Sequence, residues 1–263
     1  MFSSPNFRSF RPAAALVAWL LLAVPPAAAR ELSTDRPDQT ESPYTVERGR
    51  LQAEFQIASV GHGAGSGHAS WQCAGLNLKR GMARSVDLQL VTSGLESIPL
   101  SNGRATGVGD LTLRLKWNAR GNDSEGLAFG LMPYVAFPTG SEGLTAGGFE
   151  GGLIVPVAFP LSATIGIGVM AEADIVRNAD GSGTHAEALF TATASRDLYA
   201  PLGGFVELAA RFRPEAEGER EVMLDVGTTY GLGADLQFDA GVQWGLSAGA
   251  EDSLVFLGFT VRR

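Results

Sequence analysis

The sequence is poor in the residues that build disulfide frameworks and metal centres. It has one cysteine, Cys73, so no disulfide can form within the chain, and only three histidines among 263 residues. Basic residues are also scarce. The 20 Lys and Arg against 28 Asp and Glu give a formal net charge of −8, which argues against a nucleic-acid partner.

Long apolar runs are missing after residue 30. The one near the start, AAALVAWLLLAV (13–24), follows Arg8 and Arg11 and precedes the small residues PPAAA, which predicts a cleaved export signal over residues 1–29. A membrane anchor is the alternative, but this run is too short to span a bilayer as a helix. If the rest of the chain crosses a membrane, it must do so as a closed β-barrel, because every backbone amide needs a partner within the chain.

Alternation of apolar and polar residues is what the sequence has in abundance. RLQAEFQIASV (50–60) and GDLTLRLKWN (109–118) each put apolar side chains on one face and polar ones on the other, as half-buried strands do. The pattern predicts an all-β fold of about twelve strands. We expect them near residues 50–60, 70–80, 85–93, 109–118, 127–137, 149–159, 163–173, 185–195, 203–213, 221–230, 236–245 and 252–262.

The links between these strands alternate in length. Long links such as 94–107 and 138–148 take turns with short ones such as 81–84 and 160–162. That layout is typical of a transmembrane antiparallel β-barrel, with the short turns in the periplasm. Aromatic residues on the apolar phase fall near the two strand ends, as two interfacial belts require. They are Phe137, Phe149, Phe212 and Trp244 at the outer rim, and Trp117, Phe159 and Tyr230 at the periplasmic rim.

Two prolines conflict with this pattern. Pro133 and Pro156 lie inside predicted strands, where proline cannot donate to the ladder, and a closed barrel has no free edge. They predict either local bulges or a different register.

Four segments together resemble a known family. TDRPDQTESPYTV (34–46), TGVGDLTLRLKW (106–117), PYVAFPTG (133–140) and the last part of the chain (239–262) are similar to the outer-membrane transporter family named for a meta-pathway of phenol degradation. The resemblance implies an outer-membrane barrel that admits small compounds, apolar or aromatic ones among them, without catalysis or a cofactor. One departure is the end of the chain, GFTVRR, because barrels of this kind often end in an aromatic residue that serves the insertion machinery.

Residues 30–49 precede the first strand and lack alternation. They carry Asp35, Arg36, Asp38 and Glu41 among hydroxyl side chains and prolines. We expect this segment to be a strap that enters or crosses the periplasmic mouth, with its charges paired to lumen charges. The alternative is that residues 30–49 form a disordered leader. A calcium site is a further alternative, although the spacing is not that of a calcium loop.

The polar face of the strands predicts a lumen of mixed charge, which would set a local field for permeants. Side chains expected there are Glu54, Lys79, Asp87, Arg114, Lys116, Glu172, Glu207, Arg211, Asp225 and Asp239. For each of them, simple solvation of the interior is the competing interpretation.

The sequence gives little support for an enzymatic function. His62 and His68 lie in a Gly-rich loop without further ligands, and His185 near Glu187 lacks a serine in a nucleophile turn. We therefore expect a passive channel over residues 50–263, with outer-membrane lipid, a small permeant and the barrel-assembly machinery as partners. A structural or adhesive barrel and a secreted ligand-binding β-sandwich are the alternatives.

Overall fold

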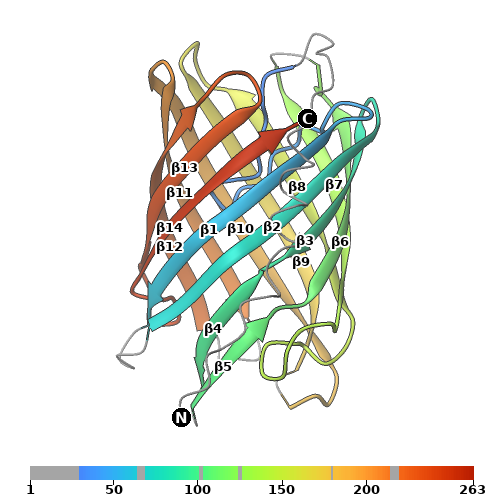
Figure 1. Cartoon of the computed structure of the whole chain (residues 1–263), viewed down its shortest axis with the longest axis vertical. Helices are drawn as coiled ribbons and strands as arrows, with labels where there is room; N and C mark the ends of the chain where they lie inside the picture. Colours follow the sequence, from blue (N-terminus) through green and yellow to red (C-terminus); the bar gives the residue numbers. More distant parts are fainter. Residues whose placement is uncertain (1–29, 64–68, 101–102, 124–125, 179, 214–218) are drawn as a thin grey trace, which may run out of the picture.

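The computed structural model describes residues 30–63, 69–100, 103–123, 126–178, 180–213 and 219–263. These residues form one antiparallel sheet that closes on itself, because β1 pairs with both β14 and β2 (Figure 1). The predicted export signal lies outside the described residues. Within them, no helix has the length and hydropathy to cross a bilayer.

The predicted strands are confirmed, most of them within a few residues. The sheet contains β1 (Leu51–His62), β2 (Ala69–Ala83), β3 (Val86–Thr92), β4 (Leu95–Leu100), β5 (Gly103–Val108), β6 (Leu111–Arg120), β7 (Ala128–Phe137), β8 (Glu150–Pro160), β9 (Ile165–Arg177), β10 (Thr184–Tyr199), β11 (Leu202–Arg213), β12 (Glu219–Gly231), β13 (Leu236–Gly245) and β14 (Ser253–Arg262). Counting β3 with β4 and β5 with β6 as single bent strands leaves a closed barrel of twelve strands.

The prediction of a loop at 94–107 is wrong. It is a β-hairpin, in which β4 pairs with β5 and β4 also pairs with the start of β2 (Figure 1). The hairpin extends the wall beyond the barrel rim at the end opposite the short turns. Sequence reasoning missed it because Gly94, with φ of +74°, interrupts the alternation between β3 and β4.

A backbone irregularity in β2 faces this bend. Ala74 has φ of +57°, a left-handed conformation that an L-residue with a Cβ adopts at a cost of about 1–2 kcal/mol. We expect Ala74→Gly to stabilise the folded barrel by about 1 kcal/mol, measured by urea unfolding in lipid vesicles. Ala188→Gly, in an ordinary stretch of β10, is the control and should destabilise it. Equal effects of the two substitutions would contradict the assignment.

The two prolines are accommodated by neither a bulge nor a shifted register. The β6–β7 ladder is unpaired between Arg114↔Tyr134 and Trp117↔Leu131, which brackets Pro133, and the register is the same on both sides of the gap. The β7–β8 ladder is likewise unpaired between Met132↔Ile154 and Phe129↔Val157, which brackets Pro156. The wall thus loses a few hydrogen bonds where proline offers no N–H.

Burial in this barrel is inverted relative to a water-soluble fold. Large apolar side chains of the strands are exposed on the outside, for example Leu115, Trp117 and Phe190, whose exposed fractions are 43%, 47% and 51%. Polar and charged side chains such as Lys116, Gln89 and Glu54 are buried inside. An outer surface of this kind is stable only against lipid, which rules out a water-soluble β-sandwich.

Candidate functional site in the barrel lumen

The strap, residues 30–49, folds into the lumen from the end with the short turns. Figure 1 shows it in dark blue inside the upper part of the barrel, near the C-terminus. Its two ends meet at the rim, where the Arg30 N–H donates to Glu47 Oε1 at 2.9 Å. The tip, residues 36–41, reaches side chains near the middle of strands β9–β12.

Asp35 is the centre of the contacts on one side of the strap. Its carboxylate forms ion pairs with the ammonium groups of Lys79 on β2 and Lys116 on β6, the latter at 2.6 Å. Lys79 is also paired with Glu54 on β1, and Glu54 accepts the Asp35 backbone N–H at 3.1 Å. All four side chains are almost fully buried, so this cluster fixes the strap to β1, β2 and β6.

The ammonium groups decide the protonation of Asp35. Burial by itself raises the pKa of this carboxyl, but Lys116 and Lys79 outweigh burial and hold its pKa well below the usual range. Because the pKa is lowered in the folded state, the contribution of Asp35 is present above the unfolded pKa. It is lost only as the pH falls through the folded value, so this link persists in mildly acid solution.

The tip of the strap is held on the opposite wall by uncharged donors. Glu207 on β11 accepts the backbone N–H groups of Gln39 and Thr40, at 2.9 and 2.8 Å, and also the Thr40 hydroxyl. The Thr40 hydroxyl lies 2.6 Å from that of Thr191 on β10. The Glu41 N–H points at the sulfur of Met170 on β9, at 3.4 Å. Hydrogen bonds rather than ion pairs therefore hold this side.

Charged residues of the tip complete the bridge across the lumen. The Arg36 guanidinium pairs with Asp239 on β13, with Nη2 to Oδ1 at 2.7 Å, and the Glu41 carboxylate pairs with Arg114 on β6. Thus Arg36 and Glu41 connect opposite walls through the strap. Asp38, also at the tip, lies near Asp225 on β12.

Gly258 on β14 provides the space for Arg36, because a Cβ at Gly258 would overlap the guanidinium. We expect Gly258→Ala to push Arg36 away from Asp239 and to make the strap tip more mobile, measured as an increase in current fluctuations of single channels in planar bilayers. Gly231→Ala is the matched control, since nothing but the Pro201 carbonyl comes within 4 Å of a Cβ there. If both variants behave as the unchanged protein, Gly258 does not position Arg36.

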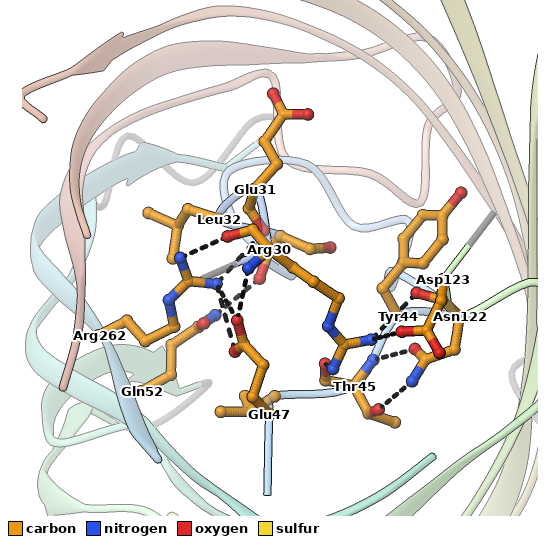
Figure 2. Close-up of a pocket in the computed structure, with 12 residues that line it drawn as sticks. Arg30, Glu31, Leu32, Tyr44, Thr45, Glu47, Gln52, Asn122, Asp123 and Arg262 are labelled. Carbon is orange, nitrogen blue, oxygen red and sulfur yellow. Dashed lines mark hydrogen bonds and ion pairs between the residues drawn. The ribbon is translucent and has the colours of Figure 1, made fainter. Parts of the chain in front are cut away.

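The base of the strap is fastened by the second residue from the C-terminus. Figure 2 shows the Arg262 side chain beside Arg30 and Glu47, in a cavity of about 630 Å³ between the two limbs of the strap. The guanidinium donates to the carbonyls of Arg30 and Glu31, at 2.7 and 3.3 Å, and to Asp235 in the β12–β13 turn at 2.8 Å. Arg262 therefore has a structural role, which is to hold the base of the strap.

The structure places the ten predicted lumen residues on the inner face of the barrel. Most of them contact the strap, as Asp87 does by accepting the Val46 N–H at 3.0 Å and Asp225 by accepting from Gln39 at 3.2 Å. The exceptions, Glu172 and Arg211, lie beyond the tip. There Arg211 meets Asp174 and Glu187 at 3.8 and 3.6 Å.

Sequence reasoning missed an apolar cluster inside the lumen. It consists of Met132, Ile154, Met170, Leu189 and Ala209, all nearly fully buried, with Tyr134 and Met223 packed against it. These residues share the inner face with polar neighbours, for example Met170 with Glu172 and Asp174 on β9. The clue in the sequence was that β10 alternates poorly, so apolar residues occur on both of its faces.

A cavity of about 680 Å³, called the vestibule here, lies between the strap and the wall formed by β8–β13. It is lined by glycines of β9 and β11, by polar side chains such as Thr193 and Thr229, and by charged side chains of the strap and of β10, among them Arg36, Asp38, Arg196 and Asp197. The β8–β9 turn also borders it, so the vestibule opens at the end with the short turns. On the opposite side of the strap, Lys79, Asp87, Gln89 and Lys116 are buried, with exposed fractions of at most 2%.

Other candidate sites do not assemble. In the described part of the chain, no group of three or more His, Cys, Asp or Glu could hold a metal ion. The calcium alternative loses its ligands, because Asp35 and Glu41 are paired with cations. His185 contacts Asn178 and Glu187, with no serine among those contacts. His68 lies outside the described residues.

These features define a class. A closed antiparallel barrel with an apolar exterior, a charged interior and short turns at one rim is an outer-membrane β-barrel, with the strap entering from the periplasmic end. An outer membrane channel from Pseudomonas putida F1 has the same fold, with a TM-score of 0.64 and 16% identity over 88% of this chain and 100% of that chain. The NanC porin is similar with a TM-score of 0.50 and 8% identity, over 81% of this chain and 98% of that chain.

The family follows from the sequence match. Residues 34–262 match the family model described as "Putative MetA-pathway of phenol degradation", and the chain belongs to this family. The resemblance noted from the four short segments is thereby confirmed. Among curated proteins, no sequence relative is found.

Proposed function

We propose that the protein is a passive outer-membrane channel for small apolar or aromatic solutes, narrowed by the strap in its lumen. The observation that carries the proposal is the combination of a lipid-facing barrel with an inner apolar cluster and a strap tied to both walls. An apolar lining inside a lumen lets weakly hydrated solutes pass without strong binding. Lipid is the surrounding partner, and the barrel-assembly machinery is the expected partner during insertion.

The strap is the part of this proposal that is simplest to remove. We expect deletion of residues 31–45 to raise single-channel conductance several-fold, because the mid-lumen contacts of the strap disappear while the strands keep their pairing. The measurement is conductance in planar bilayers, with liposome swelling in arabinose and in phenolic solutes. Heat-modifiable migration on a gel serves as the folding control.

Unchanged conductance after this deletion would rule out a narrowing role for the strap. Swelling with no solute, for the full chain and for the deletion variant, would contradict transport and would favour a structural or adhesive barrel that acts through its outer loops.

A further inference from the structure

The lumen is closed unequally on the two sides of the strap. On the side of β1, β2 and β6 the side chains of the Asp35 cluster are almost fully buried. On the side of β8–β13 the vestibule penetrates from the periplasmic rim up to Thr40 and Thr193. The strap tip packs closely against the wall where the vestibule ends. A Cβ at Gly168 would lie 3.1 Å from the Thr40 methyl group, and the Glu41 N–H meets Met170 in the next layer.

We propose that solutes pass the strap on the β8–β13 side, and that Thr40 and Glu41 at the strap tip form the closing contact that selects them. The inference rests on the proposed channel function and adds the route and the residues that control it. Opening this contact joins the vestibule, which faces the periplasmic end, to the apolar cluster, to which Met170 belongs.

The contacts of the tip break more readily than those of Asp35. Lys79 and Lys116 are buried away from the vestibule, so removing Asp35 would leave Lys116 without its ion-pair partner and Lys79 with Glu54 alone, and no water could replace Asp35. Glu207 and Thr191 instead lie beside Thr40, which lines the vestibule, so water entering with the opened tip can replace the lost hydrogen bonds. Thr40 and the Glu41 backbone therefore separate from β9–β11, while the Asp35 cluster and the Glu41–Arg114 ion pair stay in place.

The chemistry along this route favours uncharged solutes. The vestibule offers hydroxyl and amide groups beside charged side chains of both signs, and the apolar layer at the strap tip offers Met132, Ile154, Met170 and Leu189. An ion would lose part of its hydration against the apolar side chains, a cost that a neutral solute avoids, and the neighbouring Asp174 is already paired with Arg211. Flexible methionine side chains can adapt to solutes of different shapes, so the route selects for the absence of charge more than for one solute shape.

A reversible lock at the tip tests the inference. Two pairs of hydroxyls lie 2.6 Å apart, Thr40 with Thr191 across the closing contact and Ser33 with Ser42 within the strap. In a Cys73→Ala background, the variants T40C/T191C and S33C/S42C place one disulfide at each pair. We expect oxidised T40C/T191C to lose liposome swelling in arabinose and to regain it on reduction, while oxidised S33C/S42C swells at the same rate as its reduced form.

The same variants distinguish failure of the proposed function from failure of the proposed route. If neither the full chain nor the variant that lacks residues 31–45 swells with any solute, the proposed function itself is contradicted. If that deletion opens the channel but oxidised T40C/T191C still admits arabinose, only the route along β8–β13 is overturned.

Thiol labelling checks that the tip moves alone. In the Cys73→Ala background, a water-soluble maleimide should label Thr191→Cys readily and Gln89→Cys very slowly, since Gln89 lies on the fixed side with an exposed fraction of 0%. Equal labelling rates would mean that the whole strap leaves the lumen, and would overturn the proposal.

Discussion

Replacing Asp35 with alanine is expected to release the strap from its fixed side. The substitution leaves the ammonium groups of Lys79 and Lys116 buried, one with only Glu54 and the other without its closest partner. Breaking a buried ion pair by removing one partner costs about 3–5 kcal/mol. Docking of the strap should weaken by a similar amount, and ~1.4 kcal/mol corresponds to a tenfold change in the docking equilibrium.

The readout is the maleimide labelling rate of a cysteine at Gln89, which the docked strap keeps buried. A loss of about 3 kcal/mol predicts a labelling rate roughly a hundredfold higher in the Asp35→Ala background. Single-channel conductance should rise in parallel, toward that of the strap deletion.

A second substitution distinguishes the ion pair from general damage. In the double variant D35A/K116M, the ammonium group that lost its ion-pair partner is gone, so part of the docking free energy should return. If D35A/K116M is labelled faster than D35A alone, or if D35A is labelled at the unchanged rate, the assignment of Asp35 as the fixed point is wrong.

Replacing Glu207 with alanine is expected to loosen the strap tip without freeing its base. The substitution removes the acceptor of two backbone N–H groups, from Gln39 and Thr40, and of the Thr40 hydroxyl. Each donor that stays dry and unpaired costs roughly 1–3 kcal/mol. The initial rate of liposome swelling in arabinose should therefore increase, while Gln89→Cys remains protected from labelling because the Asp35 cluster is intact.

Glu207→Gln is the matched variant. Its amide keeps one acceptor oxygen for the tip but presents an N–H₂ group to the other donors, so its swelling rate should lie between those of the unchanged protein and Glu207→Ala. Swelling that is the same in all three proteins would show that Glu207 does not hold the tip closed.

The strands were predictable because each carries its own signal. Along β6, Leu111, Leu113 and Leu115 alternate with Thr112, Arg114 and Lys116, and no information from other segments is needed to recognise a strand with one face toward lipid. The β4–β5 hairpin was missed for the same local reason. Gly94 stops the alternation, and the pairing of β4 with β2 at Trp71–Cys73 joins residues far apart in the sequence.

The residue types of the site were predictable from the sequence, but the ion pairs that they form were not. Asp35 and Arg36 carried the charges needed to meet a charged lumen, but their partners, Lys79, Lys116 and Asp239, come from β2, β6 and β13. Only closure of the barrel between β1 and β14 brings these strands around one segment. The apolar cluster was equally inaccessible, because inward and outward apolar residues look alike in a single sequence.

By itself the sequence determined an all-β chain whose apolar faces need lipid and whose polar faces need an enclosed interior, because a period of two assigns each side chain to one face of its own strand. The tertiary structure alone decided what that interior contains. Ion pairs and hydrogen bonds across a lumen depend on distances between strands, and those distances exist only after the sheet has closed around residues 30–49.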